Sequence, residues 1–455
     1  MKVLKFGGTS VGTVESLRNV KKIVESIPGK AVVVVSALGG LTDKLIATAK
    51  KAATQDTSWR EDMEGIEKRH QEIIEKLVPS EKQPELQIIV DRLLGDLKRN
   101  YEGVWHLRAL PDQTLDVIVS FGERISSYIV AAIIDNGNRR DSLSFVKTEK
   151  WYGKNIAERK LTERLIKEEF LNQRDEEKTI VPGFISTDSV SGEVTNLGRG
   201  GSDYTGALIA AALDAEILEI WTDVDGFMTA DPRIVKDALV IDHLTFTESM
   251  ELCSFGAKVI YPPTIYPVFH KNIPIKILNT FNPDAPGSLI TDNILEGDLP
   301  VKGVTSLKDI SLLEVEINDV KSGDNIGNRA FNILSKEGIR IIPVDSEDPS
   351  TRFILAVTSP DAKKAIRLLE EEFAPEIRFN ILSKPNLKSE LSVLAIVGQN
   401  MKNDIRLAER INQTLLRNNI SVEAISNGNS DTTILMVIPS DCTIKALPLI
   451  HSLVI

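Results

Sequence analysis

The sequence predicts an α/β protein, in which a three-layer α/β/α domain with a mainly parallel sheet is followed by two small α+β modules. Two observations support this prediction. In the first part of the chain, short apolar runs that suit strands alternate with helical patterns, and glycines and charged residues gather where the apolar runs end. In the last part, a pattern of apolar segments repeats after 81 residues, for example from Ile310 to Leu391.

Size and composition limit the classes of function. With 455 residues the chain exceeds a single core, so several domains are expected. A formal net charge of −11 and a sequence pI near 5.2 argue against a nucleic-acid partner and against an anionic membrane surface. The sequence shows no secretory signal and no membrane-spanning run, and Cys253 and Cys442 are isolated. We therefore expect a cytoplasmic protein with small-molecule partners and no membrane partner.

The first strand candidate leads into a glycine pair. Val3 to Phe6 is followed by Gly7-Gly8-Thr9-Ser10 and then by a helical pattern, an order typical of a phosphate-binding turn. The spacing is not that of a Walker A loop, because Lys5 precedes the glycines. We expect Lys5 to be exposed at the end of the strand, where it either meets a phosphate or extends along the surface into water.

A second strand candidate brings small polar residues to the same edge of the sheet. The β-branched run Ala31 to Ala37 is typical of a strand buried on both faces, and Gly39-Gly40-Leu41-Thr42-Asp43 then opens a helix. Open α/β sheets bind ligands at the carboxyl ends of their strands, so a ligand is expected near these residues. The helical patterns from Ser58 to about Leu107 are expected to pack beside the sheet without chemistry of their own.

Glu123 is a candidate for substrate binding. The segment Ser120 to Arg124 precedes an apolar helix that is predicted over Ile125 to Ile134. In one interpretation Glu123 lies in the first turn of this helix and favours the positive end of its dipole. In the other, its carboxylate binds the ammonium group of a substrate.

The stretch Asn196 to Gly206, NLGRGGSDYTG, organises the predicted site, and an Ala-rich apolar helix follows it. Glycines let the backbone approach a ligand, and the helix directs the positive end of its dipole at the same corner. Arg199 offers a fork of donors for a carboxylate or phosphate, and Asp203 can meet an amine or a metal ion. The alternative is a plain glycine-rich turn, in which Ser202 or Asp203 only caps the helix.

The pattern of strand, charged turn and helix then repeats. The strand Ile217 to Trp221 ends in Thr222-Asp223-Val224-Asp225-Gly226. Lys258 falls in a helix that is expected from about Glu248 to Val259, and a strand from Ile273 to Leu278 closes the domain. These segments complete the parallel-sheet domain.

The C-terminal part contains two copies of one pattern. A shift of 81 residues carries Phe353-Ile354-Leu355-Ala356-Val357 onto Ile434-Leu435-Met436-Val437-Ile438. Each copy reads strand, helix, strand, strand, helix, which describes a small α+β module without a catalytic-looking cluster. We place the first domain at residues 1–283, a Pro- and Gly-rich linker at 284–300, one module at 301–385 and the other at 386–455, with the strand at 301–308 available to either module.

Five segments, taken in order, carry a resemblance to a known family. They are Lys5 to Val11 (KFGGTSV), Ser120 to Glu123 (SFGE), Gly198 to Asp203 (GRGGSD), Thr222 to Gly226 (TDVDG) and Gly256 to Val259 (GAKV). As a set they resemble the aspartokinases over nearly the whole chain. The repeated modules resemble the paired, ferredoxin-like ACT domains of that family. The chain is also similar to the kinase half of the bifunctional aspartokinase–homoserine dehydrogenases.

The resemblance implies an amino-acid kinase fold and an aspartate kinase. Such an enzyme uses ATP and Mg²⁺ to phosphorylate the side-chain carboxylate of L-aspartate, and the product, 4-phospho-L-aspartate, leads to lysine, threonine and methionine. No metal site made by the protein alone is expected. The implied site residues are Lys5, Asp203 and Lys258 for catalysis, Ser36, Thr42, Glu123, Arg199, Gly200, Gly201 and Ser202 for aspartate, and Lys5, Gly7, Gly8, Thr9, Ser10, Thr222, Asp223, Met228, Arg233, Lys258 and Val259 for ATP.

Two other classes of function stay open. One is a related kinase that acts on glutamate, carbamate or a nucleoside monophosphate, and the other is a regulator that binds amino acids or nucleotides without turnover. Glu123 and Arg199 together favour an amino acid as substrate. Met228 and Tyr261 stand where the family often has tyrosine and histidine, which removes no phosphate contact.

The modules lead us to expect regulation and self-association. Ile342-Pro343-Val344-Asp345 and Ile405-Arg406 depart from the usual ACT patterns, so the sequence does not choose between lysine and threonine as the effector. The edge strands of such modules invite pairing with another copy. A homodimer or a larger homo-oligomer is therefore expected.

Overall fold

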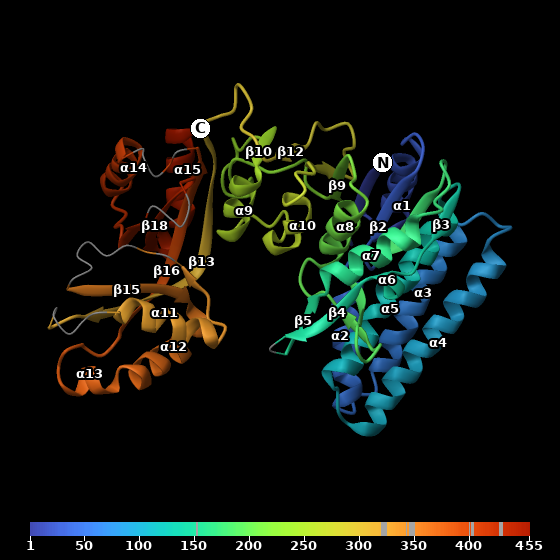
Figure 1. Cartoon of the computed structure of the whole chain (residues 1–455), viewed down its shortest axis with the longest axis horizontal. Helices are drawn as coiled ribbons and strands as arrows, with labels where there is room; N and C mark the ends of the chain where they lie inside the picture. The colour runs from blue at the N-terminus through green and yellow to red at the C-terminus, as the bar shows by residue number, and fades with distance from the viewer. Residues whose placement is uncertain are drawn as a thin grey trace. The chain divides into compact units, whose positions relative to one another are not determined.

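The computed structural model describes residues 1–151, 153–319, 325–342, 344, 351–399, 401, 405–426 and 431–455 (Figure 1). These residues form two compact units. Unit 1 consists of Met1–Phe227 and Val259–Asn293, and unit 2 of Met228–Lys258 and Ile294–Ile455. This division differs from the predicted domain boundaries, because residues 228–258 group with the C-terminal part of the chain.

Unit 1 is built on a mainly parallel sheet. Its strands, in spatial order, are β12 (Ser288–Thr291), β11 (Ile275–Asn279), β9 (Ile217–Thr222), β1 (Lys2–Phe6), β2 (Ala31–Val35), β6 (Lys178–Pro182) and β3 (Gly137–Arg139). The central strand β1 runs parallel to β2 on one side and to β9 on the other, and β12 is antiparallel to β11. The chain thus adds strands on both sides of β1. Open α/β sheets bind ligands where the strand order reverses in this way.

Helices cover both faces of this sheet. The strands form where the sequence is apolar and β-branched, and all five residues of β2 are buried. Along β1, Leu4 and Phe6 point into a core shared with helices, whereas Lys5 points to the opposite face. The helices of unit 1 are α1 (Val14–Glu25), α2 (Leu41–Ala53), α3 (Trp59–Leu77), α4 (Gln83–Leu107), α5 (Asp112–Ile133), α6 (Ser142–Phe145), α7 (Arg159–Phe170), α8 (Gly201–Ala212), the short η1 (Pro262–Thr264) and α10 (Tyr266–Phe269).

A small second sheet lies in the same unit. Its order is β5 (Lys154–Ala157), β4 (Lys147–Trp151), β7 (Ile185–Asp188) and β8 (Val194–Asn196). β8 leads directly into the glycine-rich stretch Asn196 to Gly201, so this sheet sets where that stretch begins.

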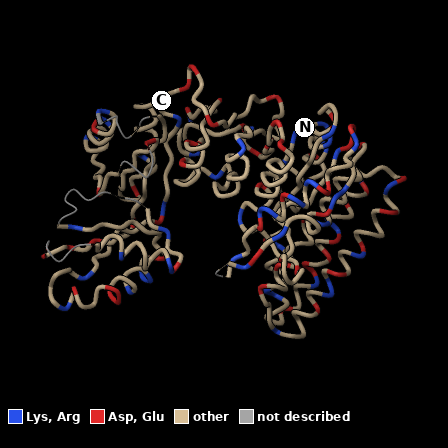
Figure 2. The backbone as a smooth tube through the Cα atoms, viewed as in Figure 1, with Lys and Arg blue, Asp and Glu red and all other residues tan. Residues whose placement is uncertain are grey.

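The prediction of helices between Ser58 and Leu107 is confirmed by α3 and α4. Lysines and arginines are interspersed with acidic residues along these helices, as Figure 2 shows. Pairs such as Lys76 with Glu72, which are 2.5 Å apart, support the helices locally. Among the helices that the structure describes, none combines the length and apolar character needed to cross a membrane.

Three predicted elements differ from the structure. The helix expected from Ile125 begins at Asp112, so Glu123 lies well inside α5 and not in a first turn. The helix expected to carry Lys258 is α9 (Phe246–Ser254), which ends before that lysine. The segment 284–300, expected to be a linker, contains the strand β12.

Unit 2 contains the repeat. Its sheet has the order β14 (Ile341–Ile342), β15 (Arg352–Thr358), β13 (Val301–Glu316), β16 (Asn386–Gly398), β18 (Thr433–Pro439) and β17 (Ala424–Ser426). The helices α11 (Ile326–Lys336) and α12 (Ser359–Glu372) follow β13 and β15, and α14 (Ile405–Arg417) and α15 (Thr443–Val454) take the same places after β16 and β18. The predicted order of strand, helix, strand, strand, helix is confirmed for both copies. Unit 2 also contains β10 (His243–Thr245) and α13 (Ala374–Arg378).

Each module has its own core, and β13 contributes to both. Leu313 and Val315 belong to one core, together with α11 and α12. Val301 and Val304 belong to the other, which also includes Ala230 from the segment 228–258. Of the departures noted in the ACT-like patterns, Pro343, Asp345 and the side chain of Ile405 lie outside the described residues.

Candidate active site

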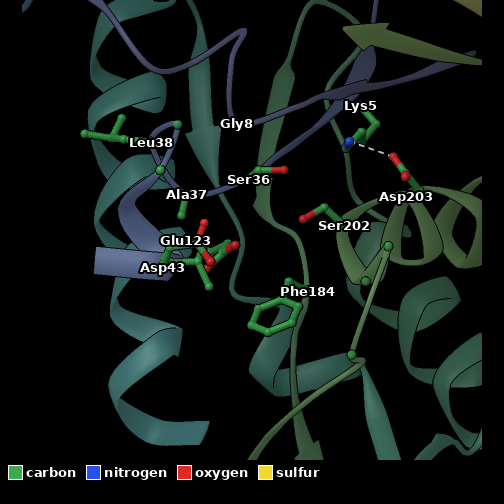
Figure 3. Close-up of a pocket in the computed structure, with 16 residues that line it drawn as sticks. Lys5, Gly8, Ser36, Ala37, Leu38, Asp43, Glu123, Phe184, Ser202 and Asp203 are labelled. Atoms are coloured by element: carbon green, nitrogen blue, oxygen red, sulfur yellow. Dashed lines mark ion pairs between the residues drawn. The ribbon is translucent and has the colours of Figure 1, made fainter. Parts of the chain in front are cut away.

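A cavity of about 350 Å³ opens at the carboxyl ends of β1, β2 and β6 (Figure 3). It is the place where the sheet topology predicts a ligand. Backbone and polar side chains make up most of its wall. The lining residues are Lys5, Gly8, Ser36, Ala37, Leu38, Gly39, Gly40, Thr42, Asp43, Glu123, Phe184, Gly198, Gly200, Gly201, Ser202 and Asp203.

Lys5 forms an ion pair with Asp203 inside this cavity. The Lys5 Nζ atom lies 2.6 Å from Asp203 Oδ1, and the two side chains are only 11% and 12% exposed (Figure 3). The expectation that Lys5 is exposed at the strand end is therefore wrong. The reason is tertiary: Lys5 points to the sheet face that α8 covers, where Asp203 supplies a counter-charge.

Two helices begin at the wall of the cavity without side-chain caps. Gly40 precedes α2 with φ of 74°, and Gly200 precedes α8 with φ of 70°. This left-handed backbone conformation suits glycine and leaves no side chain between the first helical N–H groups and the cavity. The alternative in which Ser202 or Asp203 caps the helix is wrong, because no side-chain cap is present. Both helix dipoles therefore contribute positive potential to a ligand here.

Glu123 reaches the cavity from the interior of α5. Residue 122 is a glycine because the helix packs closely on the end of β2: a Cβ atom at Gly122 would lie 2.7 Å from the Cβ of Ala37. Ser126, one turn further along, donates a hydrogen bond of 2.7 Å to the carbonyl oxygen of Ser36. These contacts fix the direction in which Glu123 points.

The carboxyl group of Glu123 is buried and only partly satisfied. The residue is 4% exposed, and among the described residues its Oε2 atom has no hydrogen-bond partner. Burial raises the pKa of Glu123 to about 8, although a hydrogen bond from the backbone of Ala37 opposes this shift. A buried carboxyl group without a cationic partner suits a ligand that brings its own positive charge.

The glycine-rich stretch is tied to α5 by a side-chain network. Asn196 Nδ2 donates to Asp116 Oδ1 at 2.5 Å, and Asn196 Oδ1 accepts a hydrogen bond of 2.9 Å from the backbone N–H of Gly198. Because Asp116 and Glu123 lie on the same helix, α5 positions both the buried carboxyl group and the loop that carries Arg199.

Arg199 lies outside the cavity, and Thr9 and Ser10 of the first glycine turn differ in their exposure. Arg199 is exposed, and its guanidinium lies over the ring of Tyr261, 5.5 Å from the centroid, so it does not line the cavity. Thr9 is exposed beside Gly8. Ser10 is fully buried, and its hydroxyl lies 2.7 Å from that of Thr280 and 3.2 Å from the carbonyl oxygen of Trp221. The structure therefore gives Ser10 a role in joining strands and does not place it at the cavity.

The remaining predicted nucleotide ligands fall in both units. Thr222 and Asp223 follow β9 in unit 1, and the Thr222 hydroxyl donates to Asp223 Oδ1 at 3.2 Å. Val259 begins the second segment of unit 1. Met228, Arg233 and Lys258 belong to unit 2, where Arg233 pairs with Asp231 at 2.7 Å and Lys258 is exposed.

Asp43 and Phe184 are among the cavity-lining residues that sequence reasoning did not assign to the site. Asp43 lies in the first turn of α2, in a segment already singled out for its glycines. Phe184 has φ of 68°, a left-handed conformation that is uncommon for a bulky residue, and its backbone N–H donates to the Thr205 hydroxyl at 3.0 Å. The sequence carries no signal for Phe184, because residues distant in the chain stabilise this turn: Thr205, and Leu197, whose backbone N–H donates to the Phe184 carbonyl oxygen at 2.9 Å.

The fold is that of a family of kinases. Residues 1–279 match the model of the amino acid kinase family, and residues 394–453 match an ACT domain model. The chain belongs to the amino acid kinase family. Within it, the chain is 33% identical over 462 residues to a bifunctional aspartokinase/homoserine dehydrogenase of Haemophilus influenzae, covering 99% of this chain and 56% of that protein. The chain thus spans little more than half the length of this curated relative.

Solved structures of aspartokinases share the fold over the full length. Escherichia coli aspartokinase III in complex with aspartate and ADP (R-state) is similar with a TM-score of 0.83 and 25% identity, covering 99% of each chain. The complex of that enzyme with lysine and aspartate (T-state) is similar with a TM-score of 0.76 and 25% identity, covering 100% of this chain and 99% of the other. The predicted class of fold is therefore confirmed.

Proposed function

We propose that the protein is an aspartate kinase, which transfers the γ-phosphoryl group of ATP to the side-chain carboxylate of L-aspartate. The observation that carries the proposal is the cavity itself. A buried carboxyl group, Glu123, shares one wall with two uncapped helix N-termini and a paired lysine. This combination suits a small ligand with both a positive charge and negative charges. The similarity to aspartokinases over 99% of the chain makes aspartate the best candidate.

Glu123 is proposed to bind the ammonium group of aspartate. The unpartnered Oε2 atom gives it a free acceptor, and an arriving cation would favour the ionised carboxylate. Ser36, Thr42 and Ser202 also line the cavity and offer hydroxyl groups to the substrate. Arg199 is assigned to the α-carboxylate, for which it has to leave its place over Tyr261. The backbone of Gly200 and Gly201 completes this side of the proposed site.

Lys5, Gly7, Gly8 and Thr9 are proposed to meet the phosphates. Gly8 and Lys5 line the cavity, so the turn brings both backbone and charge to it. The attacking group is a carboxylate that is already ionised at neutral pH, so no general base is needed. The residues then act by aligning the two substrates and neutralising charge as the phosphoryl group moves, a role for Lys5 once it exchanges Asp203 for phosphate.

The residues present fit Mg²⁺ that enters with ATP. No group of three or more His, Cys, Asp or Glu side chains close enough to hold a metal ion occurs in the described part of the chain. Mg²⁺ is commonly held by substrate phosphates together with one or two carboxylates, and Asp203 is a carboxylate beside Lys5 in the cavity. When bound, the ion would neutralise phosphate charge.

The remaining residues predicted to bind the nucleotide are Thr222, Asp223, Met228, Arg233, Lys258 and Val259. Their assignment rests on the resemblance to aspartokinases. Lysine is the proposed effector, because the E. coli aspartokinase III that this chain resembles was solved with lysine, and threonine stays the alternative. A homodimer or larger homo-oligomer and a cytoplasmic location are further predictions.

The test is acyl-phosphate formation. Purified protein with ATP and Mg²⁺ is offered aspartate, glutamate or no acceptor, and the product is trapped as the hydroxamate. Hydroxamate with aspartate alone supports the proposal, and it does so equally for the kinase part of a bifunctional enzyme. A preference for glutamate would transfer the proposal to a neighbouring activity of the family. Nucleotide binding without hydroxamate from any acceptor would favour a regulator without turnover.

A further inference from the structure

Arg69 connects the helix α3 to the first glycine turn. Its Nη2 atom donates a hydrogen bond of 2.8 Å to the carbonyl oxygen of Gly12. Gly12 ends the turn that begins at Gly7, just before Thr13 caps α1. The sequence suggested no chemistry for α3, because nothing in its pattern shows that one of its side chains reaches this turn.

The turn is closely packed against the segment that follows β2. A Cβ atom at Gly12 would lie 3.0 Å from the carbonyl oxygen of Gly8 and 3.3 Å from the backbone nitrogen of Gly39. One at Gly8 would lie 3.2 Å from the carbonyl oxygen of Ala37. Gly8 and Gly39 both line the cavity, whereas Gly12 does not. A contact that fixes Gly12 therefore also fixes the backbone at the cavity wall.

Arg69 also brings a charge that is not neutralised locally. The side chain is partly buried, and within the described residues no aspartate or glutamate forms an ion pair with it. Burial lowers the pKa of its guanidinium from the ordinary value, and no acidic group opposes this shift. Arginine remains charged at neutral pH even so. Its positive charge adds to that of the backbone N–H groups of the turn.

We propose that Arg69 is a positioning residue for the nucleotide: it holds the turn Gly7 to Gly12 through the Gly12 carbonyl and adds positive charge behind the phosphates of ATP. The proposal rests on the proposed function, in which this turn binds phosphate. It separates the two substrates, since Arg69 donates to this turn, and no hydrogen bond among the described residues joins Arg69 to Glu123 or to the stretch around Arg199. Loss of Arg69 should thus weaken ATP binding and spare aspartate.

The test compares three variants of the full chain. Arg69→Met removes both the hydrogen bond and the charge, Arg69→Gln keeps a donor without charge, and Arg69→Lys keeps the charge without the fork. Lys68→Met is the matched control, because Lys68 is the exposed neighbour on the same helix. Steady-state kinetics give KM for ATP and for aspartate, calorimetry gives the Kd of ADP, and hydrogen exchange of residues 7–13 reports the turn.

For Arg69→Met we expect KM for ATP and Kd for ADP to rise about tenfold, with KM for aspartate within about twofold of wild type. Exchange at the turn should speed up, and Arg69→Lys should fall between Arg69→Met and wild type. Lys68→Met should match wild type in every measurement.

Equal changes in both KM values, or wild-type affinity for ADP in Arg69→Met and Arg69→Gln, would overturn the inference. A lower Tm with unchanged ADP affinity below that Tm would do so as well, because Arg69 would then only stabilise the fold. If Arg69→Met does not fold, Arg69→Gln decides alone. A wild-type protein that does not bind ADP would instead contradict the proposed function.

Discussion

Lys5 and Asp203 pair at 2.6 Å although 197 residues separate them in the chain, and the pair joins the end of β1 to the first turn of α8. Each charge is removed from water and depends on the other. In the free protein the positive charge of Lys5, which is proposed to bind phosphate, is therefore already neutralised by Asp203. When ATP binds, one of its phosphates has to replace the Asp203 carboxylate as the partner of Lys5.

Substitutions in this pair can distinguish an effect on turnover from an effect on stability. Lys5→Met should abolish turnover and, because Asp203 is left without a partner, also lower the free energy of unfolding by about 1–3 kcal/mol. The double variant Lys5→Met with Asp203→Asn should recover most of the stability but none of the turnover. Thermal unfolding and the hydroxamate assay measure the two effects. Turnover of Lys5→Met within about tenfold of wild type would reject its role at the phosphates.

Glu123 should make aspartate binding depend on pH. With a pKa raised to about 8, its carboxyl group is protonated in the free site at neutral pH and attracts an ammonium group poorly. KM for aspartate should therefore fall as the pH rises from about 6.5 toward 8. In Glu123→Gln the KM should be higher and should no longer vary over this range. Asp43→Asn, which changes another carboxylate of the same cavity, should keep the pH dependence. A profile of Glu123→Gln that parallels wild type would assign the titration to another group.

The raised pKa of Glu123 also predicts how the stability of the protein changes with pH. Between the ordinary pKa of 4.5 and about 8, the folded protein holds a proton on Glu123 that the unfolded chain has released. The stability contributed by this group therefore declines as the pH rises through this window. Denaturant unfolding of wild type and Glu123→Gln at several pH values tests this. The difference between the two proteins should grow with pH in favour of the variant, and a constant difference would contradict the raised pKa.

Gly122 should be intolerant of a single added methyl group. In Gly122→Ala the new Cβ would lie 2.7 Å from that of Ala37, so α5 has to shift and take Glu123 with it. We expect a loss of about 1–3 kcal/mol in the free energy of unfolding and a lower kcat/KM for aspartate. Gly65→Ala on α3 is the control, because its Cβ meets nothing within 4 Å, and it should gain about 0.5–1 kcal/mol through helix propensity. Similar behaviour of the two variants would show that the close packing has no consequence.

Arg199→Lys tests which substrate Arg199 serves. An ammonium group cannot reproduce the two parallel hydrogen bonds of a guanidinium on a carboxylate, so KM for aspartate should rise by about tenfold or more while KM for ATP changes little. Equal losses for both substrates would place Arg199 at the nucleotide. Arg164→Lys, which changes an exposed arginine of α7, controls for the general effect of replacing a surface guanidinium.

The strands and glycine turns of the site could be predicted because they depend on local sequence. The runs that became β1, β2 and β9 are apolar and β-branched, and the structure places these strands within two residues of the prediction. Gly40 and Gly200 precede helices, as the sequence around them indicates. These apolar runs and glycines therefore predict the path of the backbone at the carboxyl edge of the sheet.

The sequence-based predictions fail where a contact between distant parts of the chain determines the structure. Lys5 is buried because Asp203 neutralises it, and no local pattern reveals that partner. The segment Ser120 to Arg124, expected to precede a helix, lies within α5, where Gly122 packs against Ala37. Arg69 resembles any charged residue of a surface helix until its contact with Gly12 is seen. Each case follows from packing between segments that the sequence alone does not bring together.

The path of the chain has a consequence for dissecting the protein. The chain leaves unit 1 after Phe227, contributes residues 228–258 to unit 2, and returns to unit 1 at Val259 before leaving it again. Within unit 2 the Thr229 hydroxyl lies 2.9 Å from Nε2 of His451, near the very end of the chain. A shortened chain that stops at residue 300 would thus remove most of unit 2, the unit to which residues 228–258 belong. Because each unit is made of two separate chain segments, point substitutions are the appropriate way to change one unit without removing residues from the other.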